Sequence, residues 1–162
     1  MLFSFLSENS KYRKGFTLIE LILVLAIFAL LTTASISNLS AYRNKQVLNG
    51  ETSQVLSMLS QARSQTLDSK SQLSYGVRIN TDRVILFPTS FASSTSGNEE
   101  YVLHHSVAIT NTSLTGGSLD VLFQRLTGET SNYGTIRVSL ISDPNQYHII
   151  SINQTGFVGL QN

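Results

Sequence analysis

The segment KGFTLIELILVLAIFALL, residues 14–31, decides the fold of the N-terminal part of this 162-residue chain. From Phe16 to Leu31 it holds 16 residues, and 21 when residues 32–36 are added. A helix of 21 residues is about 31 Å long at about 1.5 Å per residue, enough to cross a hydrocarbon core of about 30 Å. The sequence therefore predicts one membrane-spanning helix over residues 16–36, with a carboxylate, Glu20, near its start.

The basic residues around this segment predict its orientation. Lys11, Arg13 and Lys14 precede the apolar run, whereas only Arg43 and Lys45 follow it closely. Because basic flanks stay in the cytoplasm, we expect the N-terminal side to be cytoplasmic and the rest of the chain to lie outside.

Glu20 separates three interpretations of the segment. It could be a secretory signal peptide with a small-residue cleavage site at residues 32–34, or a simple signal anchor. Both leave Glu20 unexplained, because a charge at the centre of an inserted helix costs about 2.5–3.5 kcal/mol, and less near its end. In the third interpretation the chain is cut between Gly15 and Phe16. The new amino group at Phe16 of a neighbouring subunit then pairs with Glu20 in a low-dielectric helical assembly.

Residues 15–21, GFTLIEL, resemble the processing motif of type IV pilins and of the pseudopilins of type II secretion systems. The resemblance implies that a prepilin peptidase cuts after Gly15 and methylates the new N-terminal Phe16, and that Glu20 is the assembly carboxylate. It also implies the partners: that peptidase, other pilin or pseudopilin subunits and the assembly machinery. The expected location is the bacterial inner membrane, as a single-pass protein, and then a pilus or pseudopilus.

The same resemblance divides the chain into a leader peptide (1–15), a transmembrane and filament-core helix (16–37) and an outer pilin-like domain (38–162). Many pilins carry a helix-kinking proline near residues 36–38, but this chain has only Pro88 and Pro144. We therefore expect an unbroken helix, which favours a minor over a major pilin. The helix should continue to about residue 69, because an apolar stripe at helical spacing runs through Leu48, Val55, Leu59, Ala62 and Thr66.

The remainder is rich in strand patterns. Alternating apolar residues and turn residues predict strands at residues 73–80, 83–87, 101–109, 119–124, 135–141, 147–153 and 156–160, with a loop at 89–100. A long N-terminal helix followed by an antiparallel β-sheet is an α+β arrangement, the pilin fold that the resemblance implies.

Three C-terminal segments, residues 123–128, 134–138 and 149–158, resemble the pseudopilin H and FimT/FimU-type minor pilins. Members of that group typically end in Gly followed by Arg, whereas Phe157 follows Gly156 here. Some of them resemble DNA receptors, but beyond residue 15 this chain has 8 basic and 9 acidic residues, with Arg125 and Arg137 isolated. Since DNA affinity comes largely from clustered cations, nucleic acid is not expected as a partner. The expectation is a minor, tip-proximal subunit; the alternatives are a DNA- or surface-binding minor pilin, a major pilin, or a secreted or anchored β-domain.

Catalytic and metal-binding chemistry is not predicted. The chain has no cysteine, which excludes disulfides, thiolate zinc sites and a cysteine nucleophile. His104 and His105 are adjacent on an expected strand and should point to opposite faces, so they should not bind one metal together. Glu99 and Glu100 are expected to be solvated, and the single acid in residues 143–145 is too few for a calcium loop. We expect no enzyme activity, no cofactor and no metal.

Overall fold

The computed structural model describes residues 15–68, 73–89 and 97–161; the side chains of residues 33–38 and 41 also lie outside the described part. The chain divides into two compact units, Met1–Ser40 and Ala41–Asn162, which are described separately. Residues 1–14 of the expected leader, residues 69–72 beyond the helix and residues 90–96 of the expected loop fall outside the described residues.

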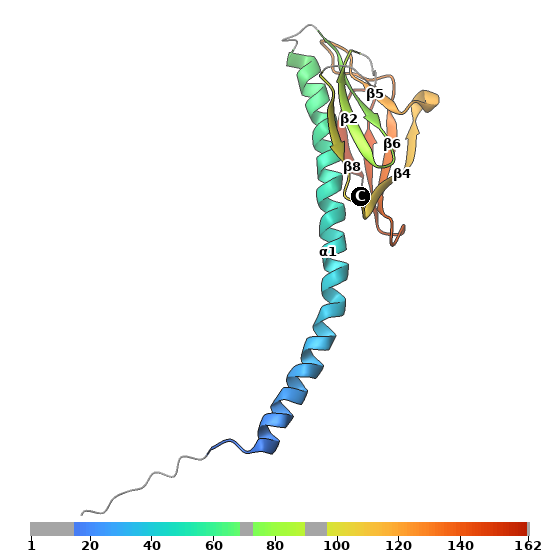
Figure 1. The fold of residues 1–162 in the computed structure, drawn as a ribbon. Coiled ribbons are helices and arrows are strands. Elements are labelled where there is room, and N and C mark those ends of the chain that lie inside the picture. The colour runs from blue at the N-terminus through green and yellow to red at the C-terminus, as the bar shows by residue number, and fades with distance from the viewer. Residues whose placement is uncertain (1–14, 69–72, 90–96, 162) are drawn as a thin grey trace, which may run out of the picture. The chain divides into compact units, whose positions relative to one another are not determined.

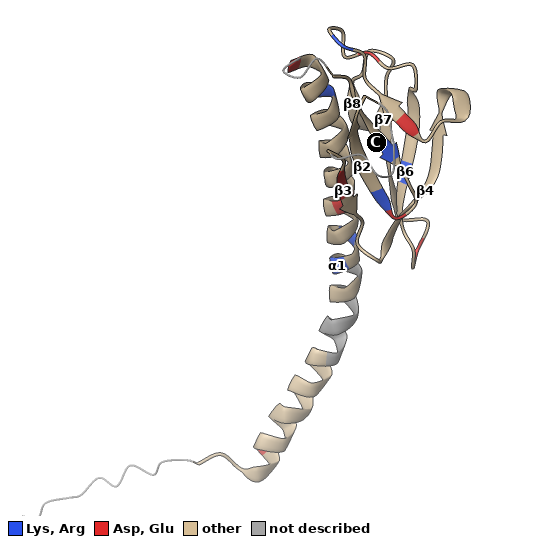
Figure 2. Ribbon diagram, turned by 45° about the horizontal axis from the view of Figure 1, so that its top comes forward, with Lys and Arg blue, Asp and Glu red and all other residues tan. Residues whose placement is uncertain are grey.

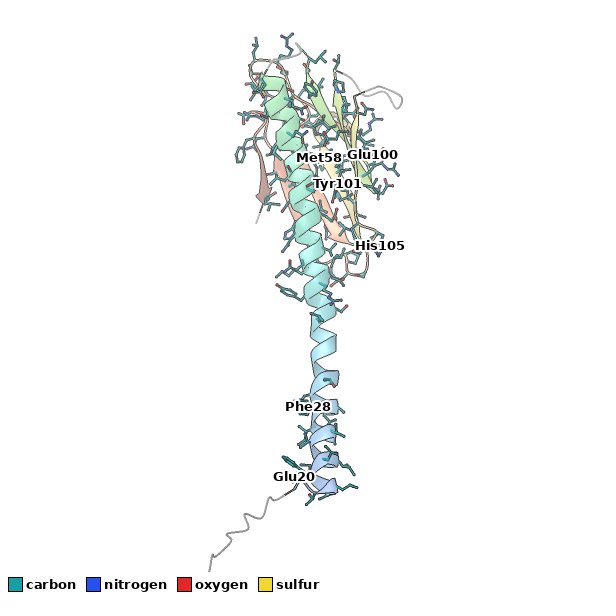
Figure 3. All side chains as sticks on the ribbon, turned by 60° about the vertical axis from the view of Figure 1, so that its left-hand side comes forward. Glu20, Phe28, Met58, Glu100, Tyr101 and His105 are labelled. Carbon is teal, nitrogen blue, oxygen red and sulfur yellow. The ribbon has the colours of Figure 1, made fainter. Side chains whose placement is uncertain are left out.

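Helix α1 (Leu18–Asp68) has 51 residues and includes no proline (Figure 1). The prediction of an unbroken N-terminal helix is confirmed. The stripe at helical spacing is confirmed too: Val55, Leu59, Ala62 and Thr66 are completely buried, and Leu48 is nearly so. This stripe, together with Met58, is the face of α1 that packs on the strands within the unit Ala41–Asn162 (Figure 3).

The strands form two antiparallel sheets of four. The first sheet has the order β3-β2-β1-β5 and the second the order β4-β6-β7-β8. The first comprises β1 (Tyr75–Ile79), β2 (Arg83–Pro88), β3 (Glu99–Val102) and β5 (Asp120–Leu122); the second comprises β4 (Val107–Leu114), β6 (Gly134–Leu140), β7 (Tyr147–Ile152) and β8 (Val158–Gln161). A short 3-10 turn, η1 (Thr115–Gly117), follows β4. The predicted α+β class is confirmed, and the division into two sheets is new information.

One predicted strand, residues 101–109, is wrong. The chain leaves the first sheet after Val102, turns at residues 104–106, and enters the second sheet at Val107. The Val107 N–H donates to the His104 carbonyl (2.8 Å), and the ring of His104 contacts the Ser106 hydroxyl (2.7 Å). The period-2 pattern continues through this turn because Leu103 and Val107 both face the same core, so periodicity alone did not reveal the change of sheet.

A single hydrophobic core lies in the unit Ala41–Asn162 and joins α1 to both sheets. Phe123 next to β5, Ile136 on β6 and Ile150 on β7 are completely buried in it. Each such side chain contributes about 1.5–3 kcal/mol by leaving water. Polar contacts fix β3 on α1: the Tyr101 hydroxyl donates to Glu51 (3.1 Å), and the Gln61 amide donates to Glu99 (3.0 Å).

Candidate functional site

Gly15, Phe16 and Thr17 precede α1 and belong to no helix or strand. Phe16 is 87% exposed, and a Cβ built on Gly15 would meet no atom within 4 Å. The peptide bond between Gly15 and Phe16 is therefore open to another protein. Glu20 lies in the first turn of α1 and is exposed; Figure 3 shows it projecting from the helix.

Thr17 caps the helix, a role that the sequence reasoning missed. Its hydroxyl accepts a hydrogen bond from the Glu20 N–H (3.3 Å), and its carbonyl accepts one from the Leu21 N–H (3.2 Å). A threonine followed three residues later by a glutamate has the spacing of a capping box, which satisfies donors at a helix start. The spacing was visible in the sequence. It places Glu20 beside the positive end of the helix, where a carboxylate is stabilised.

The helix that follows exposes apolar side chains on every face. The large apolar side chains from Leu18 to Leu31 are 41–75% exposed, and they occupy nearly every position of consecutive turns. Glu20 is the only charged residue between Leu18 and Leu31. The Thr32 hydroxyl donates hydrogen bonds back to the Phe28 and Ala29 carbonyls (3.0 Å each). A helix that is apolar all round is normally covered by lipid or by other protein.

Within the described residues, no helix is both long and apolar enough to span a membrane. The outer end of the expected span, at residues 33–36, lies where side chains are not described.

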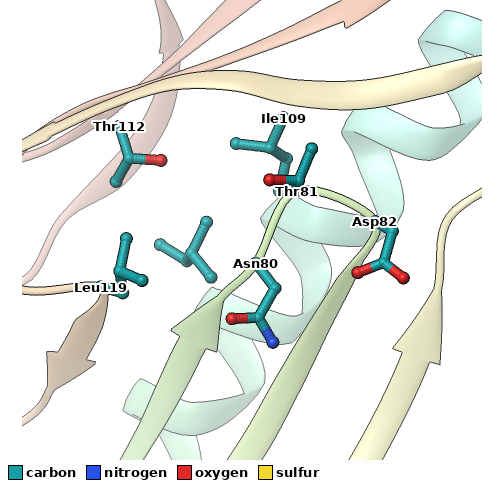
Figure 4. Close-up of a pocket in the computed structure, with 7 residues that line it drawn as sticks. Asn80, Thr81, Asp82, Ile109, Thr112 and Leu119 are labelled. Atoms are coloured by element: carbon teal, nitrogen blue, oxygen red, sulfur yellow. The ribbon is translucent and has the colours of Figure 1, made fainter.

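The unit Ala41–Asn162 offers a cavity of about 260 Å³ between the β1–β2 turn, β4 and the segment before β5 (Figure 4). Ile79, Ile109 and Leu119 line it with Asn80, Thr81, Asp82 and Thr112. Asp82 is the only ionisable lining residue, and Arg83 binds it at 2.7 Å. The hydrogen bond from Arg83 holds the pKa of Asp82 below its usual value. An ion-paired carboxylate with a lowered pKa is a weaker base than a free carboxylate.

Two of the histidines, His104 and His105, occupy other positions than expected. His104 and His105 lie at a turn rather than on a strand, and their ring centroids are 4.1 Å apart, so the prediction that they point to opposite faces is wrong. His148 contacts the Asn49 side chain (2.8 Å). Among the described residues, no group of three or more potential metal ligands lies together.

Glu99, Glu100 and Asp143 all form hydrogen bonds or ion pairs with other residues. Glu99 and Glu100 are exposed, as predicted, but they lie on β3 and not in the expected loop at 89–100. Glu99 accepts a hydrogen bond from Gln61, and Glu100 pairs with Arg83 (2.5 Å). Asp143 accepts hydrogen bonds from the Asn145 N–H (3.2 Å) and the Gln146 amide (3.1 Å), which close its turn.

Two arginines on the strands, Arg78 and Arg137, contact other residues of the same domain. Arg78 forms a bidentate pair with Asp120 (2.6 and 2.8 Å). Arg137 donates to the Pro144 carbonyl (3.0 Å) and lies 3.7 Å from the centre of the Tyr147 ring. Figure 2 shows charges of both signs scattered over the domain, without a stripe of one sign.

Comparison with known families finds a match to the N-terminal part of the chain. Residues 10–36 match the prokaryotic N-terminal methylation motif. The motif covers Gly15, Phe16 and Glu20, as the resemblance implied, and the fold that follows is a long helix packed on antiparallel sheets. No curated protein sequence matches the chain. The motif covers 27 of the 162 residues, and together with the long helix on antiparallel sheets it supports a type IV pilin-like chain.

The fold is similar to that of a solved minor pilin. Two crystal structures of the type IV minor pilin FimU from Pseudomonas aeruginosa are similar to this chain. The P65 form has a TM-score of 0.54 at 13% identity over 71% of this chain and 93% of FimU. The P21 form has a TM-score of 0.56 at 12% identity over 75% and 92%. The predicted pilin fold and the resemblance to FimT/FimU-type minor pilins are therefore confirmed.

Proposed function

We propose that this chain is a prepilin that is cut after Gly15, methylated at Phe16 and assembled into a type IV pilus or a type II secretion pseudopilus. The observation that carries the proposal is the start of α1, where the methylation motif leads into a helix with exposed apolar side chains on every face. Water is a poor environment for that surface. Lipid before assembly and neighbouring helices after assembly would cover it.

Before assembly, the proposed location is the bacterial inner membrane, with the N-terminus in the cytoplasm and the domain outside. Basic residues on the N-terminal side support this orientation. The proposed partners are the prepilin peptidase, other pilin or pseudopilin subunits and the assembly machinery.

Glu20 is the proposed assembly carboxylate. Cleavage creates a positive amino group at Phe16, and in an assembly the amino group of one subunit pairs with Glu20 of its neighbour. An apolar surrounding makes an unpaired carboxylate costly and a paired one tolerable. Glu20 would therefore favour the one stacking of neighbouring helices in which it meets an amino terminus. No other residue of α1 from Leu18 to Tyr42 is charged, so no other ion pair competes there.

A minor, tip-proximal position within the filament is proposed for the same chain. The FimU-like fold and the absence of a proline in α1 support it. The amount of this chain in purified filaments, measured by quantitative mass spectrometry, tests it. A chain that makes up most of the filament mass is a major pilin, which contradicts this part of the proposal.

Intact-mass analysis of protein purified from membranes tests the processing step. The expected mass is that of residues 16–162 with one methyl group on Phe16. The matched control is Gly15→Val, which adds a branched side chain beside the bond to be cut and should keep the leader. A mature chain beginning at Ser35, or one that retains Met1, would refute the proposal.

A further inference from the structure

Three segments distant in sequence meet at one end of the unit Ala41–Asn162. They are the last turns of α1, the turn at residues 124–129 and the turn at residues 153–157 between β7 and β8 (Figure 1). The Thr130 N–H donates to the Gln154 carbonyl (2.9 Å) and ties the two turns together. Both turns touch α1: a Cβ added to Gly128 would lie 3.1 Å from Nε of Arg63, and one added to Gly156 would lie 3.0 Å from it. We call this region the Arg63 end.

Arg63 brings a buried donor to this region. Its Nε is buried without a hydrogen-bond partner among the described residues, and none of the ion pairs among those residues includes it. A buried donor is normally satisfied, because leaving it unpaired costs free energy. Arg63 also lines a pocket of about 190 Å³ with Ser60, Gly156, Phe157 and Val158. Since Nε itself is closed to solvent, an acceptor in the pocket would meet the accessible part of the Arg63 guanidinium.

Each of the three segments carries an exposed apolar side chain. Leu126 is 82% exposed, Phe157 63% and Leu67 37%. Leu126 has a φ of 71°, a left-handed conformation that is rare for a branched residue. Strained backbone of this kind is concentrated at functional sites. A single exposed apolar residue needs no explanation, but an arginine that lines one pocket with an exposed aromatic residue has the composition of an interface hot spot.

We propose that the Arg63 end docks a second protein whose docking segment carries a carboxylate next to a large apolar side chain. The carboxylate accepts hydrogen bonds from the Arg63 guanidinium in the pocket, and the apolar side chain packs on Phe157 and Leu126. Charge complementarity selects this occupant: the pocket offers one cation and no anion. The expectation that the second protein is another pilin-type subunit rests on the proposed function, whereas the chemistry of the surface does not.

A nucleic acid fits this surface less well. Binding a phosphate backbone requires several clustered cations. The three segments add one cation, Arg125, and two exposed carboxylates, Glu129 and Asp68, so that their net charge together with Arg63 is zero. A patch with no net charge does not attract a phosphate backbone, whereas a single carboxylate needs only the one cation that lines the pocket.

Site-specific cross-linking in cells that assemble the full chain tests the proposal. The photoreactive residue p-benzoylphenylalanine replaces Leu126, and the cross-linked peptide is identified by mass spectrometry. The expected partner segment carries Asp or Glu beside a large apolar residue. Arg63→Gln should lower the cross-link yield about tenfold, the usual effect of losing one charge-assisted hydrogen bond, and Arg63→Lys should restore part of it. Arg125→Gln is the matched control and should leave the yield unchanged.

A charge swap decides whether the pairing is direct. Arg63→Glu should abolish the cross-link, and replacing the partner's carboxylate by lysine should recover it. Cross-links to nucleic acid or lipid, a partner segment without a carboxylate, no specific cross-link, or an unchanged yield in Arg63→Gln would each overturn the proposal. The mass of the mature N-terminus, measured in the same samples, reports separately on the proposed processing, so the two proposals fail independently.

Discussion

Replacing Gly156 by alanine tests how the two turns of the Arg63 end are packed. Gly156 has a φ of 75°, and a Cβ there would lie 1.7 Å from the carbonyl oxygen of Gly128. Gly116 is a matched control, because its φ is 81° and a Cβ there would meet no atom within 4 Å. Both variants place alanine in a left-handed conformation, and only one also creates an overlap.

The difference between the variants isolates the cost of the overlap. A left-handed conformation costs an L-residue about 1–2 kcal/mol, which we expect for Gly116→Ala. Overpacking adds about 1–3 kcal/mol, and here the overlapping atom is backbone, which cannot rotate away. Gly156→Ala should therefore lose about 2–5 kcal/mol in total. At about 3–6 °C per kcal/mol for a domain of this size, the melting temperatures of the two variants should differ by at least about 3 °C.

Thermal unfolding of the full chain in detergent micelles, followed by near-ultraviolet circular dichroism, measures this difference. The chain has 6 tyrosines and no tryptophan, so the signal reports on tyrosines, of which Tyr75 and Tyr101 pack against the core. Equal melting temperatures for Gly156→Ala and Gly116→Ala would show that the two turns are not in contact. The argument for the Arg63 end would then lose its structural basis.

Three further predictions concern assembly, pH and the core. Glu20→Ala should be inserted and cleaved normally but enter filaments poorly, because the partner of the neighbouring amino group is lost; normal incorporation, measured by immunoblot of sheared filaments, would remove Glu20 from the mechanism. Burial and, secondarily, the hydrogen bond to Glu51 raise the pKa of Tyr101, so its contribution to stability is present below pH about 10 and is lost as the pH rises through the raised pKa. Tyr101→Phe should therefore cost about 1 kcal/mol at neutral pH and less in alkali, as measured by urea unfolding; a pH-independent difference contradicts this. Phe123→Ala should cost about 3–5 kcal/mol because Phe123 is completely buried, whereas Phe157→Ala, at a 63% exposed position, should leave the melting temperature nearly unchanged; similar losses would mean that Phe157 belongs to the core.

Local patterns in the sequence were enough to predict the helix and the methylation motif. Helical spacing brings Val55, Leu59 and Ala62 onto one face whatever they pack against, and all three are buried. The motif around Gly15 and Glu20 is likewise contiguous in the chain, so it needs no tertiary structure to be recognised. Thr17 could have been predicted as a cap from the same few residues.

Only the tertiary structure decided which strands pair and which side chains meet across the domain. Alternation tells which side of a strand is buried but not which neighbour it pairs with, so the change of sheet between Leu103 and Val107 was invisible. Partners such as Glu100 for Arg83 lie on different strands. The Arg63 end is built from three segments that meet only when both sheets and α1 have packed, and sequence spacing carries no information about that meeting.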